Sequence, residues 1–226
     1  MTAKKTNFIG LMVPSNNTTM EREIPKWTLA EQCSVIRIPR PPGLLAQEDI
    51  PAYVEQAMNL STKFTEEKVD VVIYGCTAAG ILAGPKKDVE IGQKLSQITC
   101  KPVVTTATST ARWMQDHQME RIALLTPYSD PVNQCLTIFL QEFGIEVEVL
   151  HSMQARDTNA LGAITEEQVE QAARALMTDN CDGMFIACSQ LPTFGILGKL
   201  QSDFGRPVGS SIHATASYAL QAGRVL

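Results

Sequence analysis

Two cysteines are the residues of this chain best placed to do chemistry. Cys76 directly follows the apolar stretch 69–75, and Cys188 directly follows the apolar stretch 183–187. Small or hydroxyl-bearing residues come immediately after each cysteine. A thiolate can attack an electrophilic carbon or remove a proton, and a thiol can deliver a proton from the opposite side. The matched pair therefore predicts catalysis on a small carbon acid by two thiols acting from opposite faces.

A cysteine in such a role needs help to ionise, because a free thiol has a pKa of about 8.5. We expect a helix to begin directly after Cys76 and after Cys188. Backbone N–H groups and the positive helix end would then favour the thiolate and bind a substrate carboxylate. Either cysteine alone would also fit an ordinary buried residue at a strand end. That simpler interpretation is adopted for the other four cysteines: Cys33, Cys100, Cys135 and Cys181.

The stretches before the two cysteines predict strands that are buried on both faces. Continuous apolar runs of this length are typical of parallel sheets, whose ligands gather at the carboxyl ends of the strands. Six further strands are predicted at 8–14, 33–38, 101–105, 121–125, 145–150 and 206–210. Apolar spacing and capping residues predict helices at 20–30, 49–67, 88–98, 109–117, 131–143, 165–177 and 213–222. The residues from Pro39 to Gly43 predict a surface loop.

The second half of the chain repeats the first. The interval from Ile9 to Cys76 and the interval from Ile122 to Cys188 differ by a single residue. Lys101 and Arg206 each begin a short Pro-Val strand that leads into Thr- or Ser-rich residues and a helix. This repetition predicts an α/β fold of two similar lobes related by a pseudo-two-fold axis.

Each lobe is expected to be a mainly parallel sheet flanked by helices, with the active site between the lobes. We place the first lobe at residues 1–106, with Cys76, and the second at 107–226, with Cys188. The C-terminal helix, 212–226, is expected to pack back on the first lobe.

Composition narrows the function classes. The chain has 226 residues, of which 44% are apolar and 19% charged, as in globular proteins with a sizeable core. A net charge of −5 without basic clusters argues against a nucleic-acid partner. The N-terminal apolar run is too short for a signal peptide or a membrane span, so we expect a cytoplasmic protein with reduced thiols. Neither a metal site nor a dinucleotide-binding loop is predicted, because the required spacings are missing.

Several motifs resemble one known family. The segment from Ile9 to Pro25, IGLMVPSNNTTMEREIP, resembles the opening signature of maleate cis-trans isomerases, which belong to the aspartate/glutamate racemase superfamily. Four further motifs are similar to the same family: YGCTAA around Cys76, TPYSD around Tyr128, DTNALG around Asn159 and ACSQLPT around Cys188. The resemblance extends from about residue 7 to residue 220. The superfamily also includes amino-acid and hydantoin racemases and arylmalonate decarboxylases.

The resemblance implies a role for individual residues. Cys76 matches the nucleophile that adds to an alkene carbon of maleate, and Cys188 matches the cysteine that handles the proton on the opposite side. Three side chains fall on substrate-binding positions: Asn17, Tyr128 and Asn159. Five neighbouring residues are included in the predicted substrate site: Ser15, Thr77, Ala78, Ser189 and Gln190. Addition of sulfur, rotation about the resulting single bond and expulsion of sulfur would give fumarate with no cofactor.

The substrate is less firmly predicted than the chemistry. Asn16 stands where the family usually has serine, and the loop from Pro39 to Gly43 also departs from the isomerases. Three alternatives remain open: a racemase of an amino acid or hydantoin, a decarboxylase of a substituted malonate, and a non-catalytic binding protein. The expected partners are a small dicarboxylate and further copies of the chain in a homodimer or homotetramer, with neither a membrane nor a nucleic acid.

Overall fold

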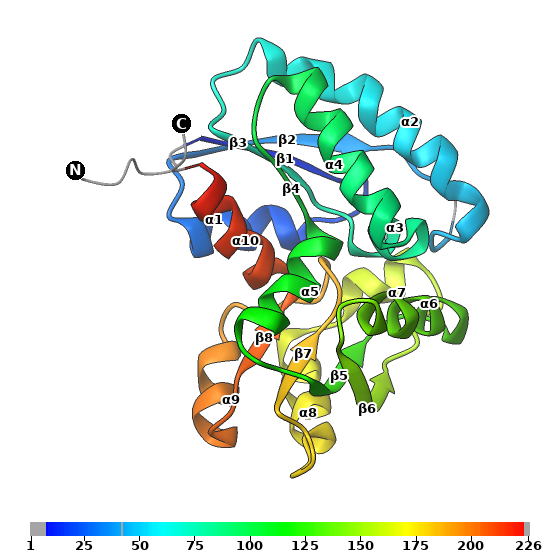
Figure 1. Cartoon of the computed structure of the whole chain (residues 1–226), viewed down its shortest axis with the longest axis vertical. Helices are drawn as coiled ribbons and strands as arrows, with labels where there is room; N and C mark the ends of the chain where they lie inside the picture. Colours follow the sequence, from blue (N-terminus) through cyan, green and yellow to red (C-terminus); the bar gives the residue numbers. More distant parts are fainter. Residues whose placement is uncertain (1–7, 42, 224–226) are drawn as a thin grey trace.

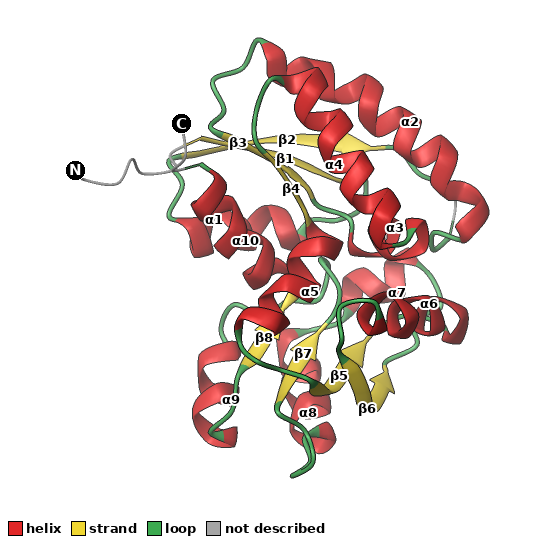
Figure 2. Cartoon of the chain, in the orientation of Figure 1, coloured by secondary structure: helices red, strands yellow, loops and turns green. Residues whose placement is uncertain are grey.

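The protein contains two four-stranded parallel sheets, one in each half of the chain (Figures 1 and 2). The structure is a computed structural model that describes residues 8–41 and 43–223. The first sheet has the order β2-β1-β3-β4: β1 (Phe8–Pro14), β2 (Gln32–Ile38), β3 (Val71–Tyr74) and β4 (Val103–Thr105). The second has the order β6-β5-β7-β8: β5 (Arg121–Thr126), β6 (Glu146–Ser152), β7 (Gly183–Ile186) and β8 (Val208–Ser210). The predicted α/β class with two similar parallel lobes is confirmed.

Helices cover both faces of the first sheet, which explains its uninterrupted apolar strands (Figure 1). One face packs against α1 (Thr19–Thr28) and α10 (Ser211–Ala222), and the other against α2 (Ile50–Ser61) and α4 (Pro85–Thr99). Along β1, Ile9 and Leu11 point to the α1/α10 side, whereas Met12 points to the opposite side. This alternation follows from the two-residue period of a strand.

The second lobe is built in the same way. Its helices are α6 (Asp130–Gln141), α7 (Thr158–Ala163), α8 (Glu166–Leu176) and α9 (Leu197–Phe204). Helix α8 begins with a capping box, because the Thr165 hydroxyl accepts a hydrogen bond from Gln168 N–H and the Gln168 side chain accepts one from Thr165 N–H. Helices α7 and α9 were not predicted, since elements of 6 and 8 residues carry little periodic pattern.

The last strand of each sheet is followed by a helix that lies between the lobes. Helix α5 (Thr106–Asp116) leads from β4 into β5 and contacts β8, whereas α10 follows β8 and packs against α1, α5 and β4. The described part of the predicted final helix therefore lies on the first sheet. Residues 224–226 and 1–7, which the predicted lobe boundaries include, and Pro42 of the predicted loop lie outside the described residues. The division of the lobes at residue 106 stays a prediction, because α5 begins there and contacts both sheets.

Gly75 allows the end of β3 to lie close to β1 and to helix α1. A β-carbon on Gly75 would lie 2.8 Å from the Met12 carbonyl oxygen and 2.8 Å from the Met20 sulfur. The chain can therefore leave β3 at this position and enter α3 (Thr77–Ala83) directly after Cys76. None of the helices in residues 8–41 and 43–223 has the length and apolar character needed to cross a membrane.

Candidate active site

The two predicted catalytic cysteines line one narrow cavity between the lobes. Cys76 follows β3 and Cys188 follows β7, which are inner strands of their sheets, and the two side chains are 3% and 5% exposed. The other lining residues come from both lobes: Pro14, Asn17, Arg40, Leu44, Leu45, Thr77, Ala78, Tyr128, Ser129, Val132, Leu161, Ser189 and Gln190. The free space is about 40 Å³, close to the volume of one water molecule. The lining side chains must therefore move apart to admit a four-carbon ligand.

Cys76 lies at the N-terminus of a helix, as predicted. It is the N-cap residue of α3, and the backbone N–H of Ala79 points toward its sulfur. The Tyr53 hydroxyl on α2 and the Arg40 guanidinium also favour the thiolate. Burial outweighs these contributions and raises the pKa of the Cys76 thiol to about 11. Cys76 therefore rests as a neutral thiol in the ligand-free cavity at neutral pH.

The prediction that a helix begins directly after Cys188 is wrong. The chain forms turns over residues 189–196, and α9 begins only at Leu197. Pro192 explains part of the difference, because it lacks an N–H and disfavours helical geometry in the residue before it. The turn still directs the Gln190 N–H at the Cys188 sulfur, at 3.3 Å. Burial raises the pKa of Cys188, opposed by the Gln190 N–H, the Tyr128 hydroxyl, the Leu191 N–H and the Arg40 charge.

Tyr128 presents a buried hydroxyl to the cavity. Its side chain is 6% exposed and lies beside the Cys188 thiol and the Thr77 hydroxyl. The hydroxyl has no partner of ordinary hydrogen-bond geometry among the described residues. The turn that carries it is fixed by Asn133, whose amide donates to the Tyr128 carbonyl oxygen at 3.0 Å. A buried, unpaired hydroxyl is costly, so its position is best explained by a ligand that supplies the missing partner.

A hydrogen-bonded network joins the two cysteine-bearing segments. The Asn17 amide donates to the backbone oxygen and to the hydroxyl of Ser189, each at 3.0 Å. Ser189 N–H donates to the Thr77 hydroxyl at 3.1 Å, and the Ser189 hydroxyl donates to the Gly75 carbonyl oxygen at 3.1 Å. Asn17 also accepts a hydrogen bond from Met20 N–H at the start of α1. Asn17 thus binds the first turn of α1 and links the two lobes at the site.

Asn16 and Gln190 form a second link across the lobes. The Asn16 amide donates to the Gln190 side-chain oxygen at 3.3 Å, and the Gln190 amide donates to the Asn16 carbonyl oxygen at 3.2 Å. The residue that departs from the family pattern in the sequence is therefore paired with a cavity-lining residue.

Two predicted substrate-binding residues do not reach the cavity in this structure. Ser15 is exposed, and its N–H donates to the Ile38 carbonyl oxygen at 2.9 Å. Asn159 is exposed on α7, whereas Leu161 of the same helix lines the cavity. Residues two positions apart point to different sides of a helix, so Asn159 turns away when Leu161 faces inward. A ligand contact by Ser15 or Asn159 would require these segments to move.

Known proteins with similar sequences identify the family of this chain. Residues 9–223 match the family model described as arylmalonate decarboxylase. The chain belongs to the arylmalonate decarboxylase family. It is 25% identical to the maleate isomerase of Geobacillus stearothermophilus, over 92% of this chain and 88% of that protein. The predicted resemblance to maleate isomerases and their superfamily is confirmed, and the expectation of an isomerase-type enzyme agrees with these relatives.

Solved structures of family members share the two-lobed fold. The maleate cis-trans isomerase of Nocardia farcinica bound to TRIS is 25% identical, with a TM-score of 0.88 and coverage of 96% of this chain and 92% of that chain. A cysteine-to-serine mutant of the N. farcinica enzyme, with a covalently bound succinylcysteine intermediate, is 24% identical with the same TM-score and coverage. These likenesses place the chain in the fold of the family.

Two polar residues of the site were not predicted as site residues from the sequence. Arg40 was assigned to a surface loop but lines the cavity, and Tyr53, within the helix predicted at 49–67, places its hydroxyl beside Cys76. Both left a signal in the sequence. Arg40 comes shortly after the carboxyl end of a predicted strand, where ligands bind in parallel sheets. Tyr53 carries a hydroxyl among the apolar side chains Val54, Ala57 and Met58 of its helix.

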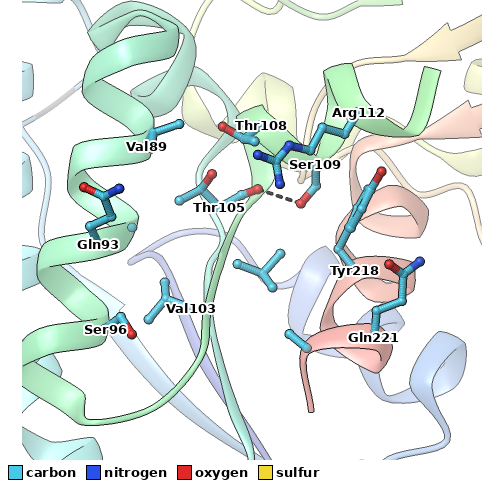
Figure 3. A pocket seen from close by; sticks show the side chains of 13 residues that line it. Val89, Gln93, Ser96, Val103, Thr105, Thr108, Ser109, Arg112, Tyr218 and Gln221 are labelled. Atoms are coloured by element: carbon cyan, nitrogen blue, oxygen red, sulfur yellow. Dashed lines mark hydrogen bonds between the residues drawn. The ribbon is translucent and has the colours of Figure 1, made fainter. Parts of the chain in front are cut away.

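A wider hollow lies elsewhere on this family member, between α4, β4, α5 and α10 (Figure 3). Its volume is about 570 Å³, and it shares no lining residue with the cysteine cavity. Figure 3 shows Arg112 and Tyr218 at its edge and the Ser109 hydroxyl donating to the Thr105 carbonyl oxygen at 2.7 Å. No cysteine lines it, so it offers none of the chemistry of the smaller cavity. Within the described ranges, no group of His, Cys, Asp and Glu side chains could hold a metal ion.

Proposed function

We propose that this protein isomerises maleate to fumarate by reversible addition of a cysteine to the double bond. One observation carries the proposal: Cys76 and Cys188 approach a single cavity from opposite lobes, beside a buried tyrosine hydroxyl that lacks a partner. The maleate isomerases among the relatives support the choice of substrate.

The proposed reaction begins when the Cys76 thiol gives its proton to water and becomes a thiolate as the cavity opens for substrate. Its sulfur forms a bond to one alkene carbon, and the π electrons move toward the carboxylate on the other alkene carbon. The Cys188 thiol then gives its proton to that carbon, which leaves a succinyl group on Cys76 and a thiolate at Cys188. Rotation about the new single bond follows. Cys188 takes the proton back, the carbon–sulfur bond breaks, and fumarate and the Cys76 thiolate are released.

The cavity is suited to the charge that develops in this reaction. Addition of sulfur places negative charge on the oxygens of one carboxylate, and donors held in advance lower the barrier to that step. The Tyr128 hydroxyl and the backbone N–H groups that follow the two cysteines are such donors. The covalent succinylcysteine in the N. farcinica mutant is the intermediate that this scheme requires, observed in that enzyme.

The experiment is to incubate the purified protein with maleate and to follow the alkene protons by NMR. We expect the maleate signal to be replaced by the fumarate signal at a rate proportional to protein concentration. Exclusion of metal by a chelator should leave the rate unchanged. Failure to convert maleate under these conditions would refute the proposal.

The family match favours one second candidate, decarboxylation of a substituted malonate. That reaction also needs a thiol to protonate a carbanion and donors for a carboxylate, but it uses one cysteine where this cavity has two. Release of carbon dioxide from an arylmalonate, measured beside the maleate assay, separates the two functions.

A further inference from the structure

The cavity contains one fully charged side chain, and it belongs to neither thiol segment. Arg40 lies shortly after β2, between Pro39 and Pro41, and is half-buried. It lines the same cavity as Cys76 and Cys188. The remaining lining residues are apolar, or carry amide, hydroxyl or thiol groups. A guanidinium group at this position therefore sets the electrostatic character of the site.

Arg40 forms no direct ion pair in the part of the chain that the structure describes. No carboxylate of residues 8–41 and 43–223 lies within 4.0 Å of its guanidinium, which donates a hydrogen bond to the Gly43 carbonyl oxygen. Burial lowers the pKa of Arg40, and negative charge on Cys76, Tyr53, Cys188 or Asp49 opposes that effect. A half-buried cation without a counter-ion is unfavourable unless a ligand supplies the negative charge.

The second lobe shows that a cation is not a requirement of the fold at this position. The equivalent segment there runs from the end of β6 to the start of α7 and contains Arg156. The Arg156 side chain is 88% exposed and pairs with Asp157 at 3.3 Å. It is absent from the lining of the cavity. Each lobe thus has an arginine in the related loop. Arg156 faces solvent and pairs with Asp157, whereas Arg40 faces the thiols and forms no ion pair.

We propose that Arg40 is a specificity-determining residue that binds the second carboxylate of the substrate. The first carboxylate is held by the Tyr128 hydroxyl and the N–H groups after the cysteines, as in the proposed function on which this inference rests. Arg40 then supplies a charge-assisted contact that a dicarboxylate can use and a monocarboxylate cannot. Because the second carboxylate is charged throughout the reaction, the contact stabilises bound substrate and transition state alike, and its loss should raise KM more than it lowers kcat.

The test measures binding separately from turnover. Succinate, a dicarboxylate without a double bond, and its monomethyl ester are titrated calorimetrically into the unaltered protein and into Arg40→Gln. We expect Arg40→Gln to weaken succinate binding about 10- to 100-fold and to change binding of the ester less than about threefold. Arg40→Lys should recover part of the loss, and Arg156→Gln should bind both ligands as the unaltered protein does.

Two results would overturn the inference. One is an equal loss of affinity for succinate and its ester in Arg40→Gln, which would indicate a general effect on packing of the cavity. The other is unchanged succinate binding. Thermal unfolding of each variant verifies that the protein is folded.

Turnover of maleate tests the proposed function, and succinate binding tests the role of Arg40. If the unaltered protein fails to isomerise maleate, the proposed function falls, while the succinate comparison still decides the role of Arg40. If maleate is converted, Arg40→Gln should raise the KM for maleate by a factor similar to the loss of succinate affinity. A drop in kcat alone, with KM unchanged, would assign Arg40 to thiolate stabilisation instead.

Discussion

The two halves of the site place equivalent cysteines in different surroundings. Cys76 and Cys188 each follow the third strand of their lobe, β3 and β7, which occupy the same place in the two sheets. Cys76 begins a helix, whereas Cys188 begins a turn that bends its own Gln190 N–H back to the sulfur. A repeated fold thus supplies two thiols, and the backbone after each strand makes them different.

The difference indicates a division of labour. The helix N-terminus at Cys76 offers a favourable electrostatic environment for a sulfur that must become a thiolate nucleophile. Cys188 lies beside the Tyr128 hydroxyl and is suited to move a proton between sulfur and carbon. Both thiols are buried, which would keep competing water from the carbanion of the proposed reaction.

Replacing each cysteine separately by serine tests the different roles of the two thiols and should have the largest effect. We expect Cys76→Ser and Cys188→Ser each to lower kcat/KM for maleate by at least about 1000-fold, because a serine hydroxyl ionises far less readily than a thiol. Cys188→Ser should accumulate a covalent adduct on Cys76, because water can protonate the carbanion slowly, whereas the thiolate that takes the proton back is missing. Intact mass spectrometry would show a gain of one maleic acid in Cys188→Ser and none in Cys76→Ser.

The exposed Cys100 provides the matched control, because Cys100→Ser changes the same chemical group outside the cavity. Its turnover and its intact mass after incubation with maleate should equal those of the unaltered protein. Equal adduct formation in Cys76→Ser and Cys188→Ser would contradict the division of labour.

The two tyrosines beside the thiols offer a sharper comparison with a smaller effect. Tyr128→Phe should lower kcat for maleate about 100-fold, because it removes one donor to the developing carboxylate charge. It should also leave the free protein as stable or slightly more stable, since the buried hydroxyl has no partner to lose. Thermal unfolding and steady-state kinetics on the same sample measure both effects.

Tyr53→Phe is the counterpart in the first lobe. Tyr53 contacts the Cys76 thiol from α2 and does not line the cavity, so we expect a loss in kcat of roughly tenfold. A larger loss for Tyr53→Phe than for Tyr128→Phe would reverse the proposed roles of the two hydroxyl groups.

Sequence patterns were sufficient to predict the architecture that brings the thiols together. Apolar runs that end at Cys76 and Cys188 specify strands buried on both faces, and the nearly equal intervals from Ile9 and Ile122 specify the same strand order in each lobe. Both cysteines and the adjacent Asn17, Thr77, Ala78, Tyr128, Ser189 and Gln190 line the observed cavity. These positions lie at or just after strand ends, which local pattern predicts, whereas the choice of Asn17 and Tyr128 came from the family resemblance.

Residues whose direction depends on loops and short helices could not be predicted in this way. Asn159 and Leu161 lie in one short helix, and only its packing decides that Leu161 faces the cavity. Arg40 lies in a proline-rich loop, where no periodic pattern indicates which side chain turns inward. The turn after Cys188 depends on Pro192 and on contacts with Asn17 and Thr77 from the other lobe. These contacts between distant segments cannot be predicted from the local sequence.

The smallest expected effect is that of Arg40 on the pKa of Cys76. The pH dependence of Cys76 alkylation, with and without Arg40, tests it. Burial raises the pKa of Cys76 to about 11, so the thiolate fraction should rise about tenfold per pH unit from about pH 7 to pH 10. In the Cys188→Ser background, iodoacetamide labelling of Cys76 should follow that rise, measured by mass spectrometry of the Cys76 peptide. Arg40 lowers the pKa of Cys76, so adding Arg40→Gln should slow labelling at every pH in this range.

Arg156→Gln is again the matched control, because its charge lies on the solvent side of the related loop. Labelling that levels off near pH 8 would contradict the dominance of burial and would show that the α3 N-terminus holds Cys76 as a thiolate in the empty site. Protection of Cys76 by succinate in either case would place the alkylated sulfur in the ligand cavity. The reactivity of one sulfur thus measures whether burial or the local positive groups prevail at the first half of the site.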